Sequence, residues 1–281
     1  MAYKDILVHL DASNNCQHRI KAAIALAKRQ EAHVTGIALA LKSTISTYVG
    51  IDIPSSLTEA QQKIVQESAQ NSVDKFEAEA KEAGVQYTSK IVECSATKAP
   101  AKLAFSARHA DLSFIGQPNP DEKGSAFQAS LLEGLLFTSG RPVYVVPYIG
   151  RFEMKVRRAV IAWDGSTKAT RAVNDAIPLL QGRSEVTVLI VNPELRRGAH
   201  GKNPGTNIAA HLERHGVNTK IECHTDHDVS TDTLILNYLS DNGADLLVMG
   251  AYSHSRLREK AFGGVTNSLL QQMTTPVLLS Q

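Results

Sequence analysis

Short apolar runs and helical stretches alternate along the whole chain. Runs such as VTVLIV at 186–191 and ADLLVMG at 244–250 are apolar almost without interruption, which is typical of parallel strands buried on both faces of a sheet. The expected strands are 5–10, 33–41, 86–93, 111–116, 142–147, 157–163, 185–191, 217–223, 244–250 and 276–280. The expected helices lie near 14–30, 60–83, 97–109, 125–139, 167–181, 205–215, 229–242 and 264–273.

The sequence also repeats itself. DILVHLDAS at 5–13 matches RAVIAWDGS at 158–166 with a spacing of 153 residues. ADLSFIGQ at 110–117 matches ADLLVMGA at 244–251 with a spacing of 134 residues. The first copy therefore carries about 19 extra residues, and the stretch 42–60, with its Gly, Pro and Ser, is the expected loop insertion.

Each copy has the order of secondary-structure elements found in a doubly wound domain. Strands alternating with helices predict βαβ units with right-handed crossovers. We therefore expect an α/β protein of two tandem domains, 1–149 and 154–281, each with a five-stranded parallel sheet of the Rossmann-like type.

Composition narrows the class of protein. The chain has 281 residues, a formal net charge of +2, 43% hydrophobic residues and 5% aromatic residues. This near-neutral charge and the few aromatics argue against a nucleic-acid partner. No apolar run approaches the roughly 18 residues of a membrane span. Three scattered cysteines without a CxxC pair suggest no disulfide framework. These features favour a cytoplasmic protein with no membrane partner.

Candidate chemistry gathers at the carboxyl ends of the strands in the second copy, where open parallel sheets bind ligands. Asp164 follows the first strand, Val191 ends the second, and Gly250 ends the fourth. Gly263 and Gly264 then open a helix, where backbone N–H groups and the helix dipole favour a phosphate. Each feature also has a plainer reading: the glycines as a loop-to-helix junction, and Asp164 as a helix cap.

The stretch MGAYSHSRLREKAFGGVT, together with DGS after the first strand and a final PVLL strand, resembles the universal stress protein family. The tandem arrangement is similar to the two-domain members of that family. The resemblance implies an adenine-nucleotide-type Rossmann-like fold and two copies packed as an intrachain pseudo-dimer, with 142–147 and 276–280 close together. A further homodimer of the whole chain and a protein partner of unknown identity are left open.

The resemblance also implies an ATP ligand, with or without Mg²⁺. Asp164 and Val191 would meet the adenine and ribose. The phosphates would be surrounded by Gly250, Ser253, His254, Gly263, Gly264, Val265 and Thr266. Ser253 departs from the family motif by replacing a glycine, and Gly264 replaces a Ser or Thr.

The first copy keeps Asp11 at the place of Asp164 but has lost the phosphate end. Pro118-Asn119-Pro120 stand where the second copy has Tyr252-Ser253-His254, and Ala129-Ser130 stand where it has Gly263-Gly264. Because proline has no N–H to offer a phosphate, we expect this copy not to bind ATP.

Two other sets of residues have metal-binding or reactive side chains. The run CHTDHD at 223–228 is rich in potential metal ligands but lacks a distant second pair, so we interpret it as a polar loop without metal. Cys94 and Cys223 end equivalent strands and are expected to be buried structural thiols.

Three functions remain open. The leading one is an ATP-binding regulatory module of the stress response, without a catalytic residue. The alternatives are a slow ATPase or nucleotide-processing enzyme, for which only Asp164 and His254 are candidates, and a binding module for a ligand other than a nucleotide.

Overall fold

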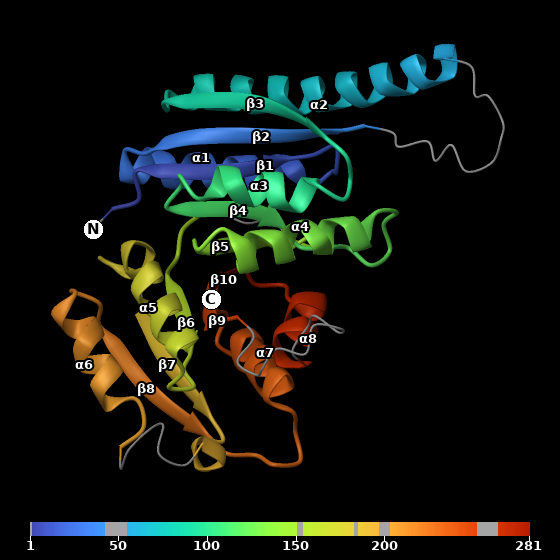
Figure 1. Ribbon diagram of the computed structural model, residues 1–281. Helices are drawn as coiled ribbons and strands as arrows, with labels where there is room; N and C mark the ends of the chain where they lie inside the picture. The colour runs from blue at the N-terminus through green and yellow to red at the C-terminus, as the bar shows by residue number, and fades with distance from the viewer. Residues whose placement is uncertain (1, 43–54, 151–153, 183–184, 197–202, 252–263) are drawn as a thin grey trace. The chain divides into compact units, whose positions relative to one another are not determined.

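The computed structural model describes residues 2–42, 55–150, 154–182, 185–196, 203–251 and 264–281. The predicted site residues Ser253, His254 and Gly263 lie outside the described residues, as does most of the expected insertion. Strands and helices alternate as predicted from the sequence (Figure 1). The chain forms two compact units. The N-terminal unit contains Tyr3–Gly116 and Gly124–Arg141, and the C-terminal unit contains Gln117–Lys123 and Pro142–Gln281.

The N-terminal unit is built on parallel strands in the order β3-β2-β1-β4. The strands are β1 (Asp5–Leu10), β2 (His33–Leu41), β3 (Tyr87–Cys94) and β4 (Leu112–Gly116). The helices are α1 (Cys16–Gln30), α2 (Ser55–Ala83), α3 (Ala99–Ala107) and α4 (Ser125–Thr138). The chain moves outward from β1 to β3 and then returns to the other side of β1. Because crossovers are right-handed, this reversal places α1 and α2 on one face and α3 and α4 on the other.

The C-terminal unit repeats this plan and adds one strand. Its strand order is β5-β10-β9-β6-β7-β8. The strands are β5 (Val143–Val146), β6 (Arg158–Ala162), β7 (Glu185–Val191), β8 (Thr219–His224), β9 (Leu246–Gly250) and β10 (Val277–Ser280). The helices are α5 (Thr167–Leu180), α6 (Thr206–Arg214), α7 (Thr231–Asp241) and α8 (Gly264–Gln272), with a short 3₁₀ turn η2 at Pro193–Arg196.

Strand β5 is the last strand of the first sequence repeat, yet it belongs to the C-terminal unit. It pairs antiparallel with β10, the last strand of the second repeat, so that Val145 faces Val277 and Val143 faces Leu279. All other strand pairs in this unit are parallel. The expectation that 142–147 and 276–280 lie together is therefore confirmed.

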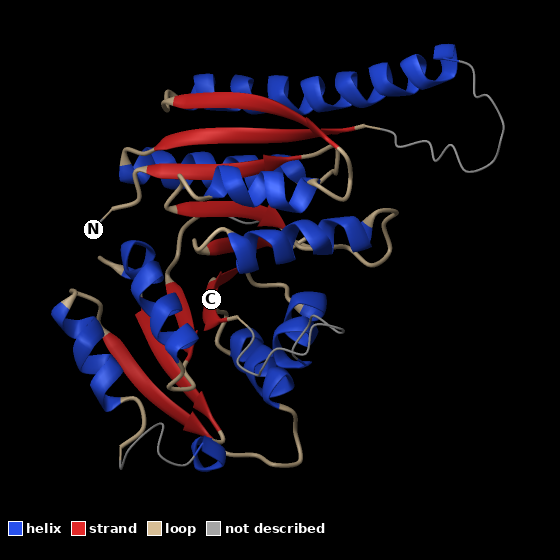
Figure 2. Ribbon diagram, viewed as in Figure 1, coloured by secondary structure: helices blue, strands red, loops and turns tan. Residues whose placement is uncertain are grey.

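Two sequence expectations were wrong. Residues 55–60 form the first turns of α2 and not a loop, because Ser-Ser followed by Leu, Glu, Ala and Gln is a good helix start. Helix α2 consequently runs along β3 and continues past its end (Figure 2). Cys94 is buried as expected, but Cys223 is exposed, because β8 is paired with β7 on one side only. Among the described residues, no helix is both long and apolar enough to cross a membrane.

Glycine at position 36 lets α2 approach the sheet. Phe76 of α2 is fully buried, and its ring packs edge-to-face on Tyr87 of β3 with centroids 5.9 Å apart. A Cβ atom on Gly36 of β2 would lie only 2.6 Å from the Phe76 ring. The large ring and the missing side chain are therefore complementary.

We predict that Gly36→Ala lowers the free energy of unfolding by about 1–3 kcal/mol through overpacking, measured by urea denaturation. Shortening the opposing side chain provides the control. The double variant Gly36→Ala/Phe76→Leu should lose less than the sum of the two single variants. Strict additivity of the two losses would contradict this packing relation.

Candidate functional site

The strand order of the C-terminal unit reverses between β6 and β9. From β6 the chain proceeds through α5 to β7 on one side, and β9 later adds on the other side. In open parallel sheets, such a reversal leaves a ligand crevice outside the carboxyl ends of the strands. Asp164 lies two residues after β6, and Gly250 is the last residue of β9. The structure therefore brings these two predicted site residues to the same edge of the sheet.

Asp164 begins the turn that leads into α5. Its Oδ1 accepts a hydrogen bond from the Ser166 backbone N–H at 3.0 Å, across Gly165, which has φ of 73°. Ser166 is the N-cap of α5, and its Oγ accepts the Ala169 N–H at 3.1 Å. The capping role considered for Asp164 thus belongs to Ser166. Asp164 is half-buried and braces the turn through one carboxylate oxygen.

Packing against α5 requires glycine at position 250. A Cβ atom at this position would lie 2.5 Å from the Ala169 nitrogen and 2.6 Å from the Lys168 carbonyl carbon. The end of β9 therefore touches the backbone of the first turn of α5. Lys168 was given no role from the sequence. It is half-buried beside this contact, and burial lowers the pKa of its ammonium.

The first residues of α8 present a different surface. Gly264 is exposed, Val265 is 37% exposed, and Thr266 is buried. No described atom lies within 4 Å of the Cβ position of Gly264, and its φ is not in the left-handed region. Neither packing among the described residues nor backbone strain therefore accounts for glycine here. Among the described residues, nothing covers the Cβ position of Gly264 in this first turn, where backbone N–H groups lack intrahelical partners.

Val191, the last residue of β7, is half-buried and is followed by Asn192, to which sequence reasoning gave no role. Asn192 is buried and has φ of 48°. Its Nδ2 donates to the Asp226 carbonyl at 3.0 Å, and its Oδ1 accepts the Asp226 N–H at 2.9 Å. Asn192 therefore fastens the segment after β8 to the end of β7.

The fastened segment contains the run 223–228 that is rich in potential metal ligands. His224 Nε2 lies 3.6 Å from Glu222, and His227 Nε2 lies 3.3 Å from Glu194. Within the described part of the chain, no three His, Cys, Asp or Glu side chains gather in a way that could hold a metal ion.

The equivalent edge of the N-terminal unit is filled by a buried ion pair. Arg19 Nη2 lies 2.8 Å from Asp11 Oδ2, and Arg19 Nε donates to the His9 carbonyl at 2.7 Å. Only 1% of Arg19 is exposed. Burial would raise the pKa of Asp11, but Arg19, His9 and Ser13 outweigh it and hold that pKa well below its ordinary value.

The guanidinium also occupies the space at the end of β4. A Cβ atom on Gly116, the residue equivalent to Gly250, would lie 2.4 Å from Arg19 Nη1. Ala129 and Ser130 lie inside α4, which begins at Ser125, so their N–H groups are in the helix interior and unavailable to a phosphate. At the 153-residue spacing, the second repeat has alanine where the first has His9, Cys16 and Arg19; those alanines are Ala162, Ala169 and Ala172.

Helix α8 is held at its far end by Gln117. The Gln117 side chain is buried, and its Nε2 donates to the carbonyls of Leu270 and Gln271 at 2.8 and 3.4 Å. Its Oε1 accepts the Tyr148 N–H at 3.1 Å, and its own backbone N–H donates to the Val146 carbonyl at 2.8 Å. Gln117 thus satisfies carbonyl groups at the C-terminus of α8 that lack helical partners.

Comparison with known proteins identifies the second repeat. The model of the universal stress protein family matches residues 155–281. The match assigns the second repeat to the universal stress protein family and does not extend to the first repeat.

A curated universal stress protein from Synechocystis sp. is 37% identical over 67 residues, which is 24% of this chain. The match spans only 22% of that relative's length.

Solved structures extend the likeness of the fold to both repeats of this chain. A universal stress protein from Archaeoglobus fulgidus has a TM-score of 0.74 at 16% identity, with 99% of this chain and 96% of that chain covered. A functionally unknown protein from Pseudomonas aeruginosa has a TM-score of 0.60 at 14% identity, with 99% and 92% covered. The α/β fold inferred from the sequence is therefore confirmed, and the match of residues 155–281 supports the inferred family.

The buried imidazole of His9 predicts a pH dependence of stability. Burial lowers its pKa from 6.5 to about 4, opposed by the Asp11 carboxylate and reinforced by Arg19. Between these values, the unfolded chain binds a proton that the folded protein does not. We therefore expect stability to fall as the pH drops from about 6.5 to 4, by a total on the order of 3 kcal/mol from this residue.

The measurement is denaturant unfolding of the wild type and His9→Gln over that pH range. The glutamine variant should lack this part of the loss, because its side chain does not titrate. Parallel curves for the two proteins would show that His9 is not responsible.

The contacts of Gln117 predict a large effect from a single substitution. Gln117→Ala should lower the free energy of unfolding by about 1–3 kcal/mol, because buried carbonyls and the Tyr148 N–H lose their partners. Amide exchange of residues 264–272 should accelerate in the same variant. Gln117→Glu should be worse, since it places a carboxylate against the Leu270 carbonyl. A glutamate variant as stable as the wild type would contradict the assignment.

Proposed function

We propose that the C-terminal unit of this universal stress protein binds an adenine nucleotide, ATP with or without Mg²⁺, and acts as a regulatory module. The observation that carries this proposal is the open glycine at the start of α8. Gly264 has no described neighbour that would exclude a side chain, whereas Gly250 is required by packing against α5. A glycine without a packing reason at a helix N-terminus is compatible with close approach by phosphate oxygens.

The remaining groups fit the other end of a nucleotide. Asp164 uses Oδ1 in the turn, and a carboxylate beside the end of β6 suits ribose hydroxyls. Val191 ends the neighbouring strand β7, on the side proposed for the adenine. Gly250, Val265 and Thr266 would border the phosphates. We retain Ser253, His254 and Gly263 in this proposed site on the sequence motif.

The N-terminal unit supports a stoichiometry of one nucleotide per chain. Its carboxylate, Asp11, already binds the Arg19 guanidinium, and Gly116 faces that guanidinium where the nucleotide would enter. A ligand that binds only the folded state stabilises it by mass action. A protein partner could then distinguish the nucleotide-bound C-terminal unit from the nucleotide-free one by the greater stability of α8 and the residues around it.

We predict that Gly264→Asp weakens ATP binding by roughly tenfold or more, because the carboxylate would repel the phosphates at a cost of about 1–3 kcal/mol. Asp164→Asn should weaken it by a similar factor while its side-chain oxygen still accepts the Ser166 N–H. Isothermal titration calorimetry gives both affinity and stoichiometry, and ADP formation over hours in the same samples tests for slow hydrolysis.

Gly250→Ala is the matched control. It should lower the thermal stability of the nucleotide-free protein, whereas Gly264→Asp, with an acidic residue at an exposed helix N-terminus, should not. Unchanged affinity in both Gly264→Asp and Asp164→Asn, or two nucleotides per chain, would refute the proposed site.

A further inference from the structure

Strand β8 is the last strand of the C-terminal sheet and pairs with β7 on one side only (Figure 1). The His224 carbonyl accepts the Asn192 N–H at 2.9 Å, so the backbone groups of the even-numbered residues of β8 face β7. Because these groups alternate in direction along a strand, those of Thr219, Ile221 and Cys223 face outward. Within the described part of the chain, no further strand lies beyond this edge.

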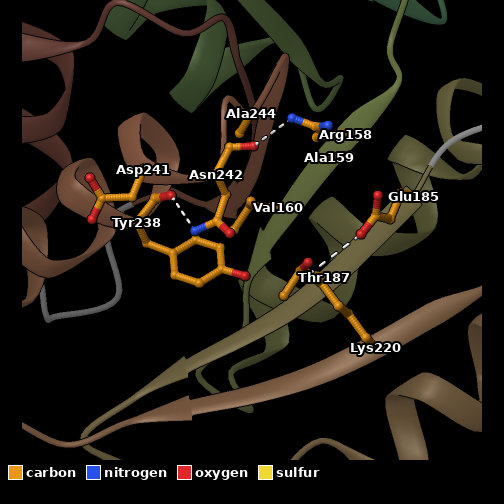
Figure 3. Close-up of a pocket in the computed structure, with 10 residues that line it drawn as sticks. All are labelled: Arg158, Ala159, Val160, Glu185, Thr187, Lys220, Tyr238, Asp241, Asn242 and Ala244. Carbon is orange, nitrogen blue, oxygen red and sulfur yellow. Dashed lines mark hydrogen bonds and ion pairs between the residues drawn. The ribbon is translucent and has the colours of Figure 1, made fainter.

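The side chains along this edge are accessible and charged. Ile221 is 39% exposed, and Cys223 is also exposed. Lys220 Nζ lies 3.5 Å from Glu185 Oε1 of β7 (Figure 3) and 3.1 Å from Glu222 Oε1 of its own strand. The unpaired backbone groups of an exposed edge strand form a template for pairing with another chain.

The order of charges along β8 is complementary to itself. When two β8 strands pair antiparallel about Ile221, Lys220 of each chain lies opposite Glu222 of the other. Pairing about Glu222 would place two carboxylates opposite each other, and pairing about Lys220 would place two ammonium groups opposite each other. Pairing about Thr219 or Cys223 would leave most of this short strand unpaired. Because directly opposite like charges destabilise a sheet and opposite charges stabilise it, the register about Ile221 is favoured.

The backbone directions agree with this register. Ile221 faces outward, so at a two-fold axis its N–H and C=O can exchange hydrogen bonds with those of Ile221 in the other chain. Thr219 of each chain forms the same kind of pair with Cys223 of the other. Lys220 and Glu222 then form non-hydrogen-bonded pairs, in which opposite side chains lie closest together. Backbone and side chains therefore favour one and the same arrangement.

Strand β3, at the edge of the N-terminal sheet, lacks this complementarity. In a symmetric antiparallel pair, two opposite residues must both face outward or both face inward, so their numbers differ by an even amount. The charged residues of β3 are Lys90 and Glu93, three positions apart. No symmetric register can bring that lysine opposite that glutamate. The self-complementary edge is therefore a feature of the second repeat.

We propose that two molecules of this protein associate by antiparallel pairing of their β8 strands about a two-fold axis at Ile221. A single strand edge is a small interface, so we expect a weak and reversible dimer. None of the proposed nucleotide-site residues lies on β8, so the inference does not rest on the proposed function.

Sedimentation equilibrium of the full, nucleotide-free chain over a concentration series tests this association. The wild type should dimerise reversibly. Glu222→Lys should weaken dimerisation roughly tenfold or more, because both opposite-charge pairs become like-charge pairs. The double variant Lys220→Glu/Glu222→Lys should restore the dimer, because each glutamate again lies opposite a lysine. Urea denaturation of each variant verifies that the monomer is folded.

Ile221→Pro tests the backbone contribution. It removes an N–H that faces outward, and it leaves the hydrogen bonds between β7 and β8 in place. The proline variant should be monomeric, whereas the matched control Ile221→Val should still dimerise.

Cysteine cross-linking under mild oxidation tests the register. Thr219→Cys should form a disulfide with Cys223 of the other chain, because a hydrogen-bonded antiparallel pair places the two Cα atoms about 5.5 Å apart. Thr219→Cys/Cys223→Ser should not cross-link, because the two introduced thiols lie at opposite ends of the paired strands. The proposal would be overturned by a wild type that stays monomeric up to about millimolar concentration, by a dimer that Glu222→Lys leaves unchanged, or by cross-linking that does not need Cys223.

Discussion

The close approach of a helix to the end of a strand governs the site in each repeat. In the second repeat, Gly250 ends β9 directly against the backbone of Lys168 and Ala169 in α5. Any side chain at 250 would push the helix away from the sheet and with it the turn that carries Asp164. This contact therefore fixes the position of the carboxylate relative to the strand ends, before any ligand is considered. The capping bond of Ser166 to Ala169 locks the same turn from the helix side.

The first repeat solves the same packing problem with different chemistry. Gly116 faces the Arg19 guanidinium, where the second repeat has Ala172. A buried guanidinium is tolerable only with a charged partner and well-placed acceptors, and Asp11 and the His9 carbonyl provide them. The carboxylate retained from the common motif has thus become a structural counter-ion. His9, Cys16 and Arg19 stand where the second repeat has alanine, and the Arg19 guanidinium fills this edge of the first sheet.

The alternation of apolar runs and helical stretches predicted the elements well because the inner strands, such as β1, β4, β7 and β9, are buried on both faces. The repeat spacing predicted which residues are equivalent, including Asp11 and Asp164. It could not predict the Arg19 contact, since the pair is joined only once strand, turn and helix are folded together. The sequence also could not show that Gly250 is required by packing while Gly264 has no described neighbour at its Cβ position, because both positions simply read as glycine. Cys223 was misjudged because the sequence does not say that β8 is an edge strand.

Divergence between the repeats also gives α8 two distinct ends. Its first turn presents exposed Gly264, while its last carbonyls are bound by Gln117, a residue contributed by the first repeat. At the equivalent place the second repeat has Ala251, whose N–H donates to Ser280 as that of Gln117 does to Val146, but which has no side-chain amide. A side-chain amide of the first repeat therefore binds the end of a helix in the second repeat, and the second repeat has no such amide at the equivalent position. Helix α8 thus connects exposed Gly264 to Gln117, which also binds the Tyr148 N–H, whereas Ala251 has no side-chain amide for equivalent contacts. The asymmetry of the two repeats thus extends from their candidate sites to the way each helix end is held.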